Sequence, residues 1–237
     1  MKILVDAMGG DEAPDVVVNG AVKAAIEYKI NIELVGDINT INPLLKKYKY
    51  SEQYISVYHA PESILMSESP ALSVRRKKNS SICVGLNLIK EKKGDAFFSA
   101  GNTGAAVCAA TLILGMLPGI ERPGIAILIP TLKGLSLIID VGANIGPKPI
   151  QLLQYGLMSD AYLHYILNRP NASVGLLNIG EEESKGTVFV RETHRLLSES
   201  RLNFVGILKG RIFFPVNAIL SFAMVLLVMS RLRFLKA

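Results

Sequence analysis

The sequence predicts an α/β protein, a three-layer α/β/α sandwich built around a mostly parallel sheet. Short apolar runs alternate with longer segments of helical periodicity along the whole chain. Several of the runs end in a polar or glycine-rich turn that opens into the next helical segment. The 237 residues are 50% hydrophobic and 7% aromatic, which supplies a core. Such alternation is typical of βαβ units with helices on both faces of the sheet.

The first part of the chain shows this alternation from its start. We expect strands at residues 3–5, 32–35 and 54–58, and helices at residues 16–28, 44–48 and 82–92. Pro14 suits the first turn of the helix that follows it, since proline has no N–H to leave unpaired there.

The alternation continues to about residue 205. We expect strands at residues 96–98, 125–129, 135–139, 174–177 and 203–205, and helices at residues 103–114, 149–167 and 187–197. No internal repeat or low-complexity linker interrupts the pattern.

The central feature is the turn at residues 99–104, Ser-Ala-Gly-Asn-Thr-Gly, between a buried strand and a helix. Its glycines permit close approach of another backbone or a ligand, and Asn102 and Thr103 can cap the helix. Free N–H groups at a helix N-terminus favour an anion, most simply phosphate. The alternative is a tight capped turn with no ligand. The turn matches neither standard nucleotide-binding motif.

Three other strands are also followed by polar or glycine-containing turns, which begin at Asp6, Asp140 and Asn178. Ligands of open α/β sheets bind outside the carboxyl ends of the strands, so we expect the four turns to form one cleft. Lys185, near a helix start, is disfavoured there by the helix dipole, and binding phosphate or polarising a carbonyl would explain it. The alternative is a surface lysine offset by Glu181, Glu182 and Glu183.

Composition excludes several classes of protein. The net charge is +6, but Arg231, Arg233 and Lys236 supply three of these charges, and the remaining excess is too small to favour nucleic acid. Cys83 and Cys108 lack metal-type spacing and suit reduced thiols in the cytoplasm. The three histidines, His59, His164 and His194, are scattered, so neither a metal site nor a Ser-His-Asp triad is expected.

The basic run Arg75, Arg76, Lys77 and Lys78 precedes the helix expected at residues 82–92. Such a run is usually a solvated face, and the alternative is a docking site for an acidic partner.

Together, several motifs resemble the bacterial phosphate acyltransferase (PlsX) family. They are residues 6–14 (Asp-Ala-Met-Gly-Gly-Asp-Glu-Ala-Pro), 99–105, 119–123 (Gly-Ile-Glu-Arg-Pro), 140–144 (Asp-Val-Gly-Ala-Asn) and 174–186. The resemblance runs in order from residue 1 to about 211. It implies a Rossmann-like sandwich, similar to isocitrate and isopropylmalate dehydrogenases, that is incomplete at the C-terminus.

The resemblance implies transfer of a fatty acyl group from acyl carrier protein to inorganic phosphate, without a cofactor, for phospholipid synthesis. The acyl phosphate would serve a membrane glycerol-phosphate acyltransferase, and a cytoplasmic homodimer peripherally associated with the membrane is expected.

The resemblance also suggests residue roles. Phosphate is placed at Gly101, Asn102, Thr103 and Gly104, with Lys185 and Asn144 in the catalytic group. Asp6, Gly9, Gly10 and Asp140 shape the cleft, and Arg75 to Lys78 meet the carrier protein. No metal is expected.

Residues 212–237 depart from the family pattern. Residues 212–230 are uncharged and followed by basic residues, so the literal interpretation is a C-terminal membrane anchor. Restoring one base after the Arg211 codon instead recovers a segment ending Asp-Gly-Phe-Val-Gly-Asn, which the resemblance implies at this place. We therefore expect an acyltransferase domain at residues 1–211 and a frameshifted tail at residues 212–237.

Two further hypotheses stay open at this point. One is an inactive truncated fragment or a membrane-tethered, non-catalytic module. The other is a dehydrogenase of related fold, which is less favoured because no dinucleotide fingerprint is present.

Overall fold

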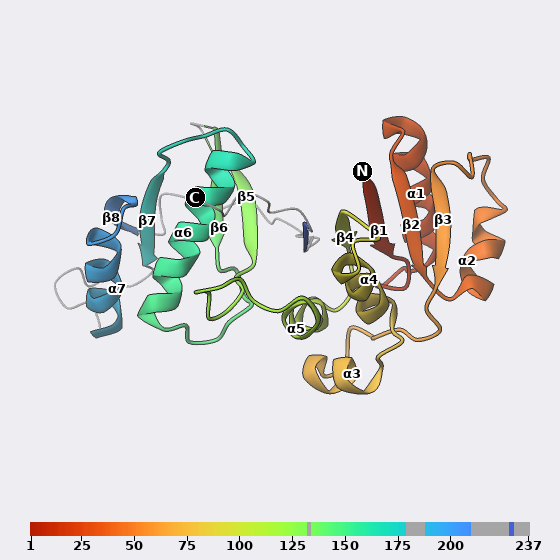
Figure 1. The fold of residues 1–237 in the computed structure, drawn as a ribbon, viewed down its shortest axis with the longest axis horizontal. Helices are drawn as coiled ribbons and strands as arrows, with labels where there is room; N and C mark the ends of the chain where they lie inside the picture. Colours follow the sequence, from red (N-terminus) through yellow and green to blue (C-terminus); the bar gives the residue numbers. More distant parts are fainter. Residues whose placement is uncertain (132–133, 179–187, 210–227, 230–237) are drawn as a thin grey trace. The chain divides into compact units, whose positions relative to one another are not determined.

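The computed structural model describes residues 1–131, 134–178, 188–209 and 228–229. The chain divides into two compact units, Met1–Gly115 with Phe222–Ala237, and Met116–Ser221. Each unit has its own sheet or sheets and its own helices, and each is described here by itself (Figure 1).

The first unit is built on a five-stranded sheet. In spatial order its strands are β3 (Ile55–His59), β2 (Asn31–Gly36), β1 (Lys2–Asp6), β4 (Ala96–Phe98) and β9 (Val228–Met229). β1 to β4 are parallel, as predicted, and β9 pairs antiparallel with β4. Because β1 and β4 are neighbours and pair in parallel, their carboxyl ends lie at the same edge of the sheet.

Successive residues of the strands face opposite sides of this sheet and enter two different cores. Leu4 and Val35 pack in a cluster with α4 (Ser81–Lys90) and α5 (Thr103–Leu114). Val5 and Leu34 pack in a second cluster with α1 (Asp15–Tyr28) and α2 (Ile38–Leu45). Helices therefore cover both faces, which confirms the predicted three layers in this unit.

Two segments of the first unit differ from the sequence-based expectation. The helix predicted at residues 44–48 is α2, which begins earlier because the Asp37 carboxylate caps it, accepting from the Asn39 N–H at 3.1 Å. The basic run begins within an unpredicted helix, α3 (Pro70–Arg76), and continues past its end. Pro70 suits its first turn, and Arg75 and Arg76 suit the negative end of its dipole.

Within its described residues, the second unit contains two pairs of strands. β5 (Ala126–Thr131) and β6 (Gly134–Ile139) form an antiparallel pair, whereas β7 (Ser173–Asn178) and β8 (Asn203–Lys209) are parallel. The antiparallel pair departs from the parallel rule because only residues 132–133 separate its strands, too few for a crossover. Its helices are α6 (Pro149–Tyr165) and α7 (Val188–Ser198).

The residues predicted as a membrane anchor or frameshifted tail lie outside the described residues, except for the two of β9. Among the helices that the structure describes, none has the length and apolar content needed to cross a bilayer.

Candidate functional site

The turns that follow β1 and β4 are joined by the carboxylate of Asp6, which is 1% exposed. The Ser99 hydroxyl donates to Asp6 Oδ2 at 2.7 Å, and the Met8 N–H donates to Asp6 Oδ1 at 3.1 Å. The Gly101 N–H in turn donates to Ser99 Oγ at 3.1 Å. Two of the predicted site segments, around Asp6 and around residues 99–104, are therefore one hydrogen-bonded structure.

Gly9 and Gly101 bring the backbones of these two turns together. A Cβ added to Gly101 would lie 2.9 Å from Gly9 Cα, and one added to Gly9 would overlap Asp6 Oδ2. Gly10 has a φ of +119°, which favours glycine over residues with a side chain. Gly9 and Gly101 therefore let the first turn lie against the second, and the cleft-shaping role of Gly9 and Gly10 stays a prediction.

Burial raises the pKa of Asp6 above its ordinary value. Hydrogen bonds from Ser81, Ser99, Met8 and Gly9 act in the opposite direction and offset part of this effect. The Asp6 carboxylate therefore joins two turns at a buried position that disfavours its negative charge. A second anion close to Asp6 would raise the pKa of Asp6 further.

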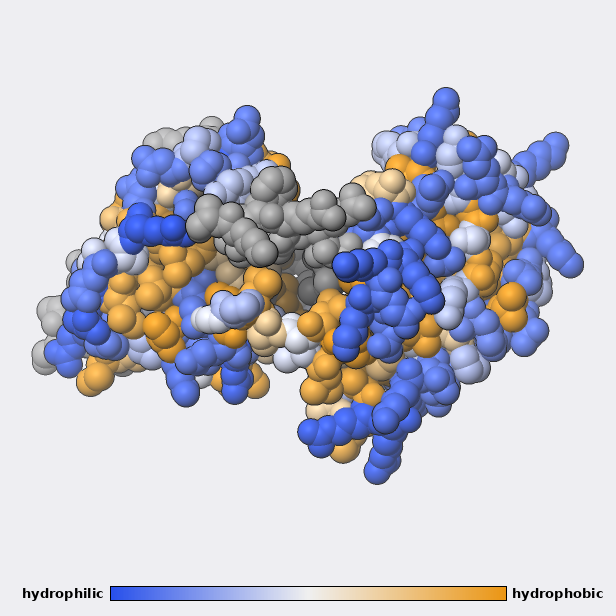
Figure 2. All heavy atoms as spheres, viewed as in Figure 1, coloured by the Kyte–Doolittle hydropathy of each residue, from blue (hydrophilic) through white to orange (hydrophobic). Residues whose placement is uncertain are grey.

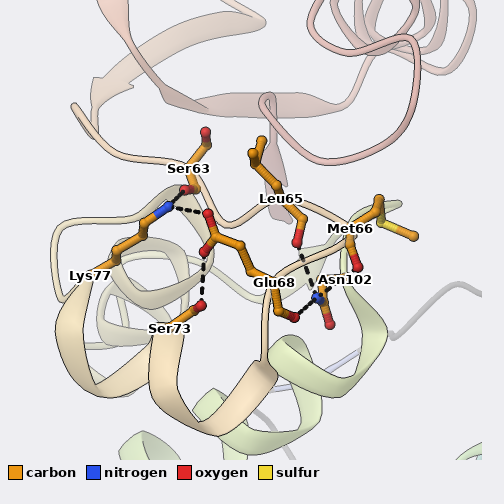
Figure 3. A network of polar contacts seen from close by, with 7 residues as sticks. All are labelled: Ser63, Leu65, Met66, Glu68, Ser73, Lys77 and Asn102. Atoms are coloured by element: carbon orange, nitrogen blue, oxygen red, sulfur yellow. Dashed lines mark hydrogen bonds and ion pairs between the residues drawn. The ribbon is translucent and has the colours of Figure 1, made fainter.

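Asn102 caps α5 and also binds another segment. Its Oδ1 accepts the Ala105 N–H at 3.0 Å. Its Nδ2 donates to the carbonyl oxygens of Leu65 at 3.1 Å, Met66 at 3.4 Å and Glu68 at 3.1 Å (Figure 3). The Asn102 side chain is therefore fully engaged. An anion at this turn would meet the backbone N–H groups of Thr103 and Gly104. These belong to the first turn of α5, where an N–H group has no carbonyl partner within the helix.

The basic run does not act as a single surface. Lys77 Nζ donates to the Ser63 carbonyl at 2.8 Å and pairs with the Glu68 carboxylate (Figure 3). Hydrogen bonds from Lys77 and Ser73 hold the pKa of Glu68 below its usual range. Arg75, Arg76 and Lys78 are exposed. Of the predicted docking residues, these three face solvent, and Lys77 stabilises the segment before α3.

In the second unit, Asp140 and Asn144 form a separate network. Asp140 Oδ1 accepts the N–H groups of Ile125, Gly142 and Ala143, and Oδ2 accepts the N–H and amide of Asn144. The Asn144 amide also donates to the Pro123 carbonyl at 2.7 Å and the Tyr155 hydroxyl at 2.9 Å.

Burial acts to raise the pKa of Asp140, but the hydrogen bonds from Ala143, Asn144 and Ile125 outweigh it, so this pKa lies below its ordinary value. Asp140 is thus an ionised anchor that shapes the loop, and the Asn144 side chain is held by contacts within its own unit.

Sequence reasoning placed some of these residues and missed others. It named the two turns, Asp140 and Asn144, but it assigned no role to Glu68, Ser99 or Tyr155. Ser99 follows the strand directly, which is the signal that could have identified it; Glu68 and Tyr155 have no such local signal. Lys185 lies outside the described residues, and the single cleft formed by four turns stays a prediction.

No metal centre is present in the part of the chain that the structure describes: it contains no cluster of three or more His, Cys, Asp and Glu side chains that could hold an ion.

Comparison with known proteins gives consistent matches. A family model described as "Fatty acid synthesis protein" matches residues 1–218. The phosphate acyltransferase of Alkaliphilus oremlandii is 47% identical over 211 residues, which cover 89% of this chain and 63% of that protein. The phosphate acyltransferase of Dictyoglomus turgidum is 47% identical over 220 residues, which cover 92% of this chain and 66% of that protein. The chain thus spans less than two thirds of the length of these relatives.

Solved structures show the same fold. A phosphotransacetylase from Streptococcus pyogenes superposes with a TM-score of 0.65 at 20% identity, covering 88% of this chain and 68% of that one. The EutD phosphotransacetylase from Staphylococcus aureus gives a TM-score of 0.61, also at 20% identity, with the same coverage of both chains. At this identity the likeness establishes the α/β architecture only.

Proposed function

This chain belongs to the fatty acid synthesis protein family, and we propose that it transfers a fatty acyl group from acyl carrier protein to inorganic phosphate. The observation that carries the proposal is the 47% identity, over 211 residues, to a protein named phosphate acyltransferase. The turn at residues 99–104 supports it, because it presents backbone N–H groups at the start of α5 beside a second glycine-containing turn.

The proposed reaction does not require a side chain of the protein to form a covalent bond with the substrate. A phosphate oxygen attacks the thioester carbonyl carbon, the C–O bond forms, the C–S bond breaks, and the carrier thiolate leaves and takes up a proton. Phosphate is already an anionic nucleophile near neutral pH, so the protein must position it and stabilise the oxyanion of the tetrahedral intermediate. No activated serine or cysteine is needed.

We assign the phosphate to the turn formed by Gly101, Asn102, Thr103 and Gly104, with contacts from the backbone because the Asn102 side chain is engaged elsewhere. Lys185 would stabilise phosphate or the oxyanion. Asn144 would contribute to the catalytic group, and Asp6, Gly9, Gly10 and Asp140 would shape the cleft.

The partners in this proposal are acyl carrier protein, a membrane glycerol-phosphate acyltransferase and a second copy of the chain, with the protein in the cytoplasm at the membrane surface. An acidic carrier would meet the exposed cations Arg75, Arg76 and Lys78. Figure 2 shows hydrophilic side chains next to hydrophobic surface at the bottom of the view, where Figure 1 places α3. That combination is suited to a partner that carries both charge and an apolar group.

The charge reversals Arg75→Glu and Arg76→Glu test the docking assignment. Together they should raise the KM for acyl carrier protein by roughly tenfold, because rim charges act mainly on association, with kcat little changed. Lys23→Glu, on the exposed face of α1, is the matched control. An unchanged KM in the double variant would rule out this docking surface.

The proposed activity itself is tested by release of free carrier thiol from palmitoyl carrier protein. The release should require both the chain and phosphate. Release without phosphate would indicate simple thioester hydrolysis instead.

A second candidate is a non-catalytic module of the same ancestry, which would bind phosphate without transferring an acyl group. It predicts that phosphate binds to the turn at residues 99–104 but that no thiol is released.

A further inference from the structure

Residues 63–69 lie between β3 and α3, and side chains from other parts of the first unit hold this irregular segment by several hydrogen bonds. Lys77 Nζ binds the Ser63 carbonyl at 2.8 Å, and the Ser73 hydroxyl binds the Glu68 carboxylate at 2.8 Å. Asn102 Nδ2 binds three carbonyls of the same segment at 3.1 to 3.4 Å. The segment is thus fixed to α3 on one side and to the start of α5 on the other (Figure 3).

This segment presents two large apolar side chains to solvent. Leu65 is 58% exposed and Met66 is 52% exposed, whereas Ile64 beside them is 4% exposed and anchors the segment in the core. Single exposed apolar side chains are ordinary on protein surfaces. These two differ in their position, because their own carbonyls are bonded to the residue that caps α5.

The proposed reaction brings an apolar group close to the turn at residues 99–104. Attack on the thioester requires the carbonyl carbon to lie within about 3.5 Å of a phosphate oxygen. The acyl chain begins at that carbon and must leave the turn along a neighbouring surface. The backbone carbonyls of Leu65 and Met66 accept hydrogen bonds from Asn102, which directly follows Gly101 in the turn.

We propose that residues 63–69 form the acyl-chain wall of the site, with Leu65 and Met66 in contact with the chain and Asn102 as the positioning residue that holds the wall. This proposal rests on the proposed function and specifies its second substrate: a thioester with a long, flexible apolar chain. Burying parts of two apolar side chains against such a chain favours long acyl groups over short ones.

Binding of non-hydrolysable product analogues tests the wall without requiring turnover. The probes are acyl phosphonates of sixteen and of four carbons, titrated calorimetrically into the full chain. Met66→Ser and Leu65→Ser should each weaken binding of the long analogue by roughly three- to tenfold, since each removes apolar contact area. The short analogue should change by less than about twofold, because it does not reach the wall.

Leu112→Ser is the matched control for Leu65→Ser. Leu112 has the same exposure, 58%, and lies on α5 nine residues after its first residue, about 13 Å along the helix axis at 1.5 Å per residue. Its substitution should leave binding of both analogues unchanged.

Asn102→Ser tests the positioning role without adding a charge beside the phosphate turn. The serine hydroxyl can still cap α5 by accepting the Ala105 N–H, but the amide donor to Leu65, Met66 and Glu68 is lost. We expect it to weaken the long analogue more than the short one. Asn87→Ser is the control, since Asn87 also donates to a carbonyl of the first unit, that of Cys83 at 2.9 Å, but does not touch the segment.

The outcomes separate this inference from the proposed function. If the unaltered chain binds both analogues and the Leu65, Met66 and Asn102 variants bind the long analogue with unchanged affinity, the wall is overturned and the phosphate site stands. If the unaltered chain binds neither analogue, the proposed function fails and the wall fails with it. Equal weakening of both analogues by Met66→Ser would overturn the wall as well, because it would show general damage instead of chain recognition.

Discussion

Gly9 and Gly101 determine how closely the two turns of the first unit approach. Gly101→Ala would place a Cβ 2.9 Å from Gly9 Cα, a contact with backbone that cannot rotate away. We expect a loss of about 1–3 kcal/mol in the free energy of unfolding, typical of an overpacked site, and weaker phosphate binding. Urea unfolding and phosphate titration measure the two effects.

Gly20→Ala is the control for this substitution. Gly20 lies in α1, and an added Cβ there would meet no atom within 4 Å. It should stabilise the protein by about 0.5–1 kcal/mol, since alanine is the better helix former. If Gly101→Ala were as stable as Gly20→Ala, the close approach of the two turns would be refuted.

At the same scale, the sequence identified the residues of the turns but not their partners. Asn102 was predicted as a cap or an anion ligand, and it is indeed a cap. Its three bonds to residues 65–68 join positions more than thirty residues apart, which no local pattern encodes. Lys77 belongs to a basic run, and only the fold shows that its charge is used internally by Glu68.

At the scale of elements, the loop of residues 140–144 depends on an ionised carboxylate. Asp140 has a pKa below its ordinary value of 3.8. The stabilisation it gives is therefore fully present above that ordinary value and is lost as the pH falls through the lower, folded-state value. Asp140→Asn should cost about 1–3 kcal/mol at neutral pH, because hydrogen bonds to a charged acceptor are lost.

Melting temperatures measured from neutral pH into the acid range below 3.8 test this assignment, since the stabilisation is lost only as the pH falls through the folded-state pKa. The gap between the unaltered chain and Asp140→Asn should narrow as the pH falls below 3.8. Asp160→Asn on α6 is the control, because the Asp160 side chain makes no hydrogen bond or ion pair within the described residues. A gap that stays constant with pH would show that Asp140 does not act through its charge.

The elements themselves were predictable to different degrees. Strands β1 to β4 and helices α1, α4 and α5 follow from apolar periodicity, because each has a buried face. α3 was missed because it is short, with only Ser73 and Val74 buried. The antiparallel pairing of β5 and β6 depends on the length of their connection, which the pattern of apolar residues in the strands does not encode.

At the scale of the whole molecule, the sheet of the first unit ends on one side in a very short strand. β9 contributes two residues, paired with Ala96 and Phe97 of β4. A fragment of residues 1–211 lacks β9 and exposes this edge, so we expect it to aggregate more readily than the full chain. Light scattering during concentration compares the two, and a monodisperse, cooperatively unfolding fragment would contradict this expectation.

The proposed function requires the chain to make acyl phosphate from a carrier-bound acyl group and inorganic phosphate. The most direct measurement is phosphorus NMR of the purified 237-residue chain with palmitoyl carrier protein and phosphate. We predict an acyl phosphate signal that grows with protein concentration and is reduced by Gly101→Ala. Its absence, with folded protein and intact thioester in the tube, would contradict the claim and leave the non-catalytic module as the function of this chain.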